Sequence, residues 1–99
     1  FLSKLKMKFF NKNDFTDVIA FRLNSYEEQR VEGEIYISLP RAKENAKIYE
    51  EHYKKEVARL IIHGCLHLLG YLDETKNQKQ IMTNLENVFL DRMIWEKLF

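Results

Sequence analysis

The segment that most restricts the fold is a nearly unbroken apolar stretch, LIIHGCLHLLGYLDE, at residues 60–74. Its leucines, isoleucines and cysteine surround two histidines, His63 and His67, which indicates a helix that is buried on most sides. An imidazole buried without a partner costs about 1–3 kcal/mol. The helix therefore has to pack against other elements while both histidines find partners, either a metal ion or hydrogen bonds within the core.

The spacing of the polar residues in this stretch favours a metal site. His63 and His67 are four residues apart, so they project from one helix face, one turn apart. Gly70 and Asp73 complete the pattern H-x-x-x-H-x-x-G-x-x-D, a spacing that brings a third ligand to the metal in metzincins because the glycine lets the chain turn back. Two nitrogens and one carboxylate suit Zn²⁺ with an open coordination position. We predict one zinc ion per chain, bound by His63, His67 and Asp73, with other divalent metals as alternatives.

The residue after the first histidine argues against a peptidase. Metal-dependent peptidases of the H-E-x-x-H type carry their general base at this position, and here it is Gly64. Glycine cannot accept a proton, and inside a helix it costs about 1 kcal/mol relative to alanine. We therefore expect another element of the fold to approach the helix backbone closely at Gly64.

Two short strands are predicted in the first half of the chain. Residues 15–23, FTDVIAFRL, are rich in β-branched and aromatic side chains, and residues 34–39, EIYISL, alternate apolar with polar positions. Residues 1–10 fit either a strand or one face of a helix. Pro40 ends the second strand and suits the first turn of a helix.

The second half of the chain is predicted to be helical. A helical pattern runs through residues 41–69, and Gly70 is well placed to end it. A last helix begins at about residue 76, with apolar residues at helical spacing at Ile81, Leu85, Val88 and Phe89. The predicted fold class is α+β, a small sheet packed against helices, in a single domain over residues 1–99.

The composition restricts the class of protein. Ninety-nine residues, of which 45% are hydrophobic, can build one core. One cysteine excludes an internal disulfide and suits a reducing cytosol, and no apolar run approaches the ~20 residues of a membrane span. We expect a cytoplasmic protein with no membrane partner and no small-molecule cofactor. Phe1 stands where an initiator methionine would be expected, which indicates a processed or truncated chain.

Several stretches of the chain resemble one known family. HGCLHLLGYLDE (63–74) is similar to the motif H-G-x-L-H-L-x-G-Y-D-H, and TDVIAF (16–21) and GEIYIS (33–38) are similar to two strands, T-D-V-L-S-F and G-D-I-x-I-S. Met82 and Glu86 match an M-x-x-x-E pattern in the closing helix. These patterns are those of the YbeY family, bacterial metal-dependent endoribonucleases involved in ribosomal RNA maturation.

The resemblance implies a metal-dependent endoribonuclease, a hydrolase acting on single-stranded RNA in 16S ribosomal RNA maturation and ribosome quality control. It implies ribosomal RNA and ribosomal particles as partners. It covers the chain from about residue 9, and family members usually carry a further strand–helix–strand portion before that point. The alternative is a catalytically weak ribosome-assembly or RNA-binding factor with a structural metal site. A metallopeptidase comes third, because Gly64 disfavours it.

The chain departs from the family pattern within the motif itself. Asp73 stands where the third ligand is usually histidine, and Leu72 stands where the family has aspartate. The neighbouring Glu74 is the competing third ligand, but the spacing to Met82 supports Asp73.

A further departure concerns a cation. Phe10 occupies the position of an arginine that the resemblance links to cleavage, so a phosphate-binding guanidinium would have to come from elsewhere. Arg59 lies one helical turn before His63 on the same face and is the candidate for this catalytic role. The competing interpretation of Arg59 is a solvated helix residue or an ion pair.

Overall fold

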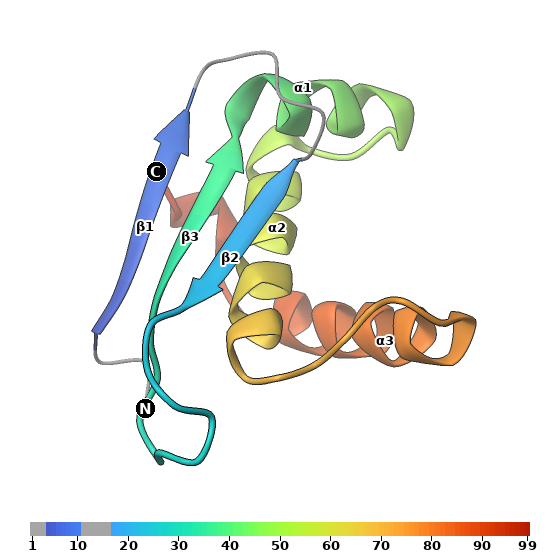
Figure 1. Cartoon of the computed structure of the whole chain (residues 1–99). Coiled ribbons are helices and arrows are strands. Elements are labelled where there is room, and N and C mark those ends of the chain that lie inside the picture. Colours follow the sequence, from blue (N-terminus) through green and yellow to red (C-terminus); the bar gives the residue numbers. More distant parts are fainter. Residues whose placement is uncertain (1–3, 11–16) are drawn as a thin grey trace.

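The fold is a three-stranded sheet with helices, as a computed structural model describes it for residues 4–10 and 17–99 (Figure 1). The strands are β1 (Lys4–Phe10), β2 (Val18–Arg22) and β3 (Glu32–Ser38), in the order β1-β3-β2. β1 runs parallel and β2 antiparallel to the central β3. The helices are α1 (Leu39–Ile48), α2 (Tyr53–Leu68) and α3 (Lys76–Arg92), followed by the short 3-10 helix η1 (Trp95–Lys97). The predicted α+β class is confirmed.

The histidine helix α2 is the central element of this fold. It lies against one face of the sheet, in contact with β2 and β3, and it also contacts α1, α3 and η1 (Figure 1). The buried core forms between α2 and the sheet from Val31, Ile35, Ile37, Ala42, Val57, Leu60 and Leu68. Burial alternates along β3, which is why the apolar alternation in its sequence predicted a strand. No helix in the described part of the chain is long and apolar enough to cross a membrane.

Two glycines let α2 lie this close to the sheet. A Cβ atom at Gly64 would stand 2.9 Å from Cγ2 of Ile35, which is fully buried in β3. On the other side of the contact, a Cβ atom at Gly33 would stand 2.6 Å from Cδ2 of Leu68. The element that approaches the helix backbone at Gly64 is therefore β3.

Gly64→Ala is expected to lower the free energy of unfolding by about 1–2 kcal/mol, although alanine is the better helix former. The new methyl group meets three carbon atoms of Ile35, at 2.9–3.2 Å, and the Ile35 side chain is fully buried. In an Ile35→Ala background the same change is expected to stabilise the protein by up to about 1 kcal/mol, since the obstacle is gone. Urea unfolding of the four proteins measures both effects. Equal effects in the two backgrounds would contradict this account of Gly64.

The helix predicted over residues 41–69 is in fact two helices. α1 ends before Glu50, which takes a left-handed conformation with φ 54°. The N–H of Glu51 donates to the carbonyl oxygen of Ala46 at 2.9 Å, and the N–H of Glu50 donates to that of Lys47 at 3.4 Å. This Schellman arrangement usually has glycine at the left-handed position. Because glutamate takes that place here, the sequence gives no stop signal before His52 caps α2.

The strands and the last helix also differ in detail from the prediction. The strand predicted over residues 15–23 is β2, and it ends at Arg22, one residue earlier than predicted. Residues 15 and 16 of the predicted strand lie outside the described residues. The ambiguous first ten residues contain a strand, β1. α3 begins after a capping box of Thr75 and Gln78. Its buried residues are Met82, Glu86 and Leu90, whereas three of the predicted apolar positions are exposed, namely Ile81, Val88 and Phe89.

Candidate metal centre

The end of α2 turns the chain back toward the two histidines. Gly70 has φ +103°, a backbone conformation that favours glycine. The N–H of Gly70 donates to the carbonyl oxygen of His67, and the N–H of Tyr71 donates to that of Leu66, each at 3.0 Å. This is a Schellman C-cap, as predicted for Gly70. The loop that follows it carries Asp73 to the histidines.

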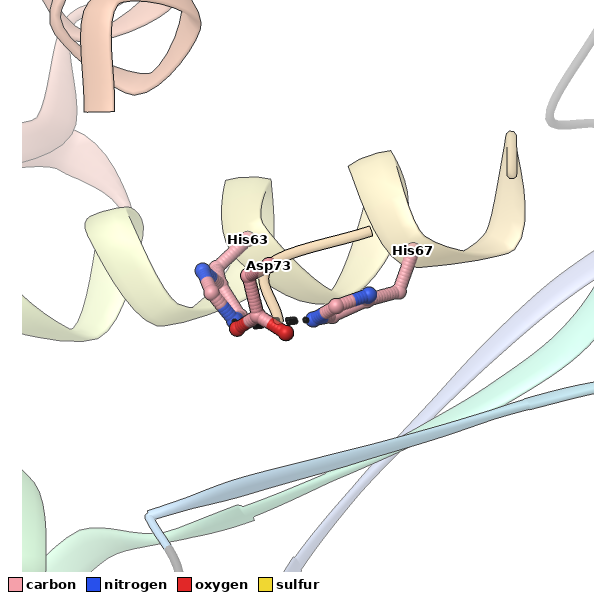
Figure 2. Close-up of side chains that lie close together, drawn as sticks. All are labelled: His63, His67 and Asp73. Atoms are coloured by element: carbon pink, nitrogen blue, oxygen red, sulfur yellow. Dashed lines mark hydrogen bonds and ion pairs between the residues drawn. The ribbon is translucent and has the colours of Figure 1, made fainter. Parts of the chain in front are cut away.

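The three predicted ligands meet on the side of α2 that is turned toward the strands (Figure 2). Nε2 of His63 and Nε2 of His67 are 3.0 Å apart. Oδ2 of Asp73 lies 3.3 Å from the first nitrogen and 3.4 Å from the second. Ligand atoms around a tetrahedral zinc ion with bonds of about 2.0–2.1 Å are separated by about 3.3 Å. The three atoms therefore have the separations that one ion requires, and all three side chains are half-buried. Glu74 is not in this group.

A second partner orients each histidine. Nδ1 of His63 lies 2.6 Å from Oε2 of Glu86, and Nδ1 of His67 lies 2.9 Å from the carbonyl oxygen of Tyr71. A carboxylate and a carbonyl both accept, so in the neutral rings Nδ1 carries the proton and Nε2 presents its lone pair. Two lone pairs and the Asp73 carboxylate then face one another, an arrangement that positive charge stabilises.

The electrostatics of the centre favour positive charge there. Burial lowers the pKa of His63, but the carboxylates of Glu86 and Asp73 outweigh it and hold the pKa above its usual value. A bound divalent ion would supply this positive charge while both imidazoles stay neutral. The donor set of His63, His67 and Asp73 thus fits a divalent transition metal.

The chain is similar in sequence to known proteins. A family model described as "Endoribonuclease YbeY" matches residues 2–94 of the chain. The chain belongs to the YbeY family. "Endoribonuclease YbeY" of Karelsulcia muelleri (strain GWSS) is 38% identical over 91% of this chain and 62% of its own length, and that of Amoebophilus asiaticus (strain 5a2) is 39% identical over 91% and 60%. That of Chloroherpeton thalassium (strain ATCC 35110 / GB-78) is 45% identical over 76% and 52%. The chain spans about three fifths or less of the length of these curated relatives.

In this YbeY-family chain Arg59 lies beside the centre, but carboxylates engage its guanidinium. Its NH1 is 3.4 Å from Oε1 of Glu86 and 3.3 Å from Oδ1 of Asn87, and its Nε is 3.7 Å from Oε1 of Glu56. Glu56 and Glu86 are only 4% and 6% exposed, so Arg59 is the countercharge of two buried carboxylates. Since Glu86 also holds His63, Arg59 reaches the centre through Glu86. The catalytic role of Arg59 stays a prediction, and its contacts are those of the competing ion-pair interpretation.

A cleft of about 290 Å³ opens beside the centre, between α1, α2, α3 and the start of β2. Its charged wall residues are Asp17, Glu56, Arg59, Asp73, Lys79 and Glu86. Lys79 is exposed, and its ammonium group makes no ion pair or hydrogen bond with the described residues. Neither the role of Glu86 nor the place of Lys79 was predicted from the sequence. The M-x-x-x-E pattern pointed to Glu86 without giving it a partner, and nothing in the sequence singled out Lys79.

Proposed function

We propose that this YbeY-family chain is a metal-dependent endoribonuclease that cuts single-stranded RNA at a zinc ion held by His63, His67 and Asp73. The observation that supports it is the convergence of three ligand atoms at the separations of a single ion, with both histidines oriented by a second partner. Other divalent metals are alternatives to zinc. Ribosomal RNA and ribosomal particles are the proposed partners, in 16S ribosomal RNA maturation and ribosome quality control in the cytoplasm.

Each residue of the centre has a separate role in the proposed reaction. A bound zinc ion supplies Lewis acidity and positive charge at a phosphoryl oxygen of the RNA. Glu86 and the carbonyl group of Tyr71 keep His63 and His67 in the binding orientation. Lys79 is the cation of the cleft wall that is free to contact the RNA backbone, because Arg59 is held by carboxylates.

The charge of the cleft makes RNA binding depend on the ion. Four carboxylates and two cations line it, so with neutral histidines its formal charge is negative and repels phosphate. A divalent ion balances that charge. We therefore propose that RNA enters the cleft of the metal-loaded protein and is repelled from that of the metal-free one.

The second candidate function is a ribosome-assembly or RNA-binding factor with a structural metal. The ion pairs of Arg59 with Glu56 and Glu86 favour this function, because an arginine held in this way does not replace the guanidinium missing at Phe10. The side chain of Phe10 itself lies outside the described part of the chain. A metallopeptidase stays third. In the place of its general base the chain has Gly64, which β3 requires for packing.

Single-stranded ribosomal RNA is expected to be cut by the purified protein, with loss of cleavage in a chelator and recovery on adding Zn²⁺. Casein is expected to remain intact, because no general base follows His63. His63→Ala should lose both bound metal and RNA cleavage. His52→Asn is the matched control, since this third histidine lies outside the centre and asparagine can replace it as the cap of α2, and it should keep both. Metal content per chain and gel analysis of the RNA measure these outcomes.

Three results would change the proposal. Chelator-sensitive cleavage of casein without cleavage of RNA would make the chain a peptidase. Binding of ribosomal particles without any cleavage would favour the assembly factor. RNA cleavage that survives in His63→Ala would remove the metal centre from the reaction.

A further inference from the structure

A second hollow, of about 600 Å³, adjoins the metal centre at His67. Two tyrosines line it, Tyr26 from the loop between β2 and β3 and Tyr71 from the loop after α2, together with apolar residues of β2. Tyr26 is 62% exposed and Tyr71 is 42% exposed, so both residues are accessible from solvent. Exposed aromatic rings beside a site that acts on a polymer suggest contact with that polymer.

The Tyr26 ring is held in a fixed place. The guanidinium carbon of Arg22 lies over it, 4.6 Å from the ring centroid. Arg22 is itself anchored, because it donates hydrogen bonds to the carbonyl oxygens of Leu68 at 2.6 Å and Ser25 at 2.9 Å. One edge of the ring lies along Gly70, where a Cβ atom would be 3.6 Å from two ring carbons. Tyr26 is thus supported from the end of α2 and needs little ordering when a ligand arrives.

Tyr71 is tied to the metal centre through its backbone. Its carbonyl oxygen accepts the hydrogen bond from Nδ1 of His67, and its N–H donates to the carbonyl oxygen of Leu66. Two residues further on, Asp73 supplies the carboxylate of the centre. A group bound in this hollow therefore lies next to whatever group is bound at the three ligands.

We propose that the hollow binds an unpaired nucleobase of the RNA, adjacent to the phosphate at the metal centre, with Tyr26 and Tyr71 as its stacking partners. This inference rests on the proposed function. The hollow offers flat aromatic surfaces and apolar side chains, which suit the face of a base, and stacking tolerates every base because each has a π-face. A base within a duplex is already stacked on its neighbours and does not enter such a hollow. Selectivity for single strands then comes from this hollow and not from the metal ligands.

The test measures binding of a short fluorescein-labelled single-stranded RNA to the zinc-loaded protein by stopped-flow anisotropy, before the RNA is cut. Tyr26→Ala is expected to weaken binding about 5- to 100-fold. Tyr26→Trp should restore it, because indole stacks at least as well. The matched control is Tyr36→Ala. Tyr36 alternates with the buried Ile35 and Ile37, so it lies on the opposite face of the sheet, and its loss should leave binding unchanged. Zinc content of each variant shows whether the centre is intact.

A single abasic nucleotide, placed at each position of the RNA in turn, separates stacking from other effects, and one position is expected to matter most. At that position it should weaken binding to the wild type and have little further effect on Tyr26→Ala, since the base and the ring form one interaction. Equal binding by Tyr26→Ala and the wild type would overturn the inference, as would an equal loss in Tyr36→Ala. If the wild type binds through Tyr26 but cuts no RNA, the inference stands and the endoribonuclease proposal fails. If it cuts RNA and binding ignores Tyr26, only the inference fails.

Discussion

Asp73→Ala is expected to lose most of the bound metal, whereas Glu74→Ala keeps it. Oδ2 of Asp73 lies 3.3 and 3.4 Å from the two histidine nitrogens, and its removal leaves two ligands. Losing a partner outside the ligand shell typically costs 10–100-fold in metal affinity, and losing a ligand should cost more. Glu74 is exposed, and its N–H serves the start of α3 by donating to the side chain of Gln78 at 3.0 Å.

The two substitutions test which acidic residue is the third ligand, and zinc titration of both variants decides it. Asp73→His is the matched replacement, because the motif that this stretch resembles ends in histidine at this position, and it should keep the metal. Wild-type affinity in Asp73→Ala would show that the assignment is wrong. A loss confined to Glu74→Ala would move the third ligand by one residue.

Glu86→Ala is expected to destabilise the protein by about 1–3 kcal/mol and to weaken zinc binding 10–100-fold. The carboxylate is almost fully buried and has two partners, Nδ1 of His63 at 2.6 Å and NH1 of Arg59 at 3.4 Å. Its removal leaves the half-buried Arg59 with Glu56 as its acidic partner and frees the imidazole of His63 to rotate. Urea unfolding without metal measures the first effect, and zinc titration measures the second.

Two further variants separate the roles of Glu86. Glu86→Gln retains an oxygen for His63 but no charge for Arg59, so it should recover metal affinity more fully than stability. Glu44→Ala removes one partner of an exposed ion pair with Arg41 and is expected to change stability by less than about 1 kcal/mol. Unchanged zinc affinity in Glu86→Ala would mean that this residue does not orient His63.

The geometry of the metal ligands was predictable from the sequence because local rules set most of it. His63 and His67 share a helix face by their spacing alone, and Gly70 identifies the turn that returns Asp73. The burial of α2 followed in the same way from its apolar composition. These relations involve neighbours in the chain and do not depend on how distant elements pack.

The features that were missed depend on packing between distant elements or break a local rule. Glu86 reaches His63 across 23 residues, so its role depends on how α3 lies against α2. Apolar periodicity misjudged the buried face of α3 because that face carries this carboxylate. The end of α1 went unseen because Glu50 occupies a position where glycine is the usual signal. Tyr26 is a candidate for binding a base only because the loop after β2 lies beside Gly70, and that contact is not visible in the sequence.

The contact between Gly64 and Ile35 restricts how this part of the chain can vary over evolution. The helix that carries both histidines rests directly on a branched side chain of β3, with no room for one more carbon atom. A larger residue at position 64 is then tolerated only with a smaller one at position 35, and either change alone displaces the histidines relative to the strands. Across related sequences the two positions should therefore change in size together. The size of a side chain in the sheet, outside the three ligands, is in this way linked to the position of the metal centre.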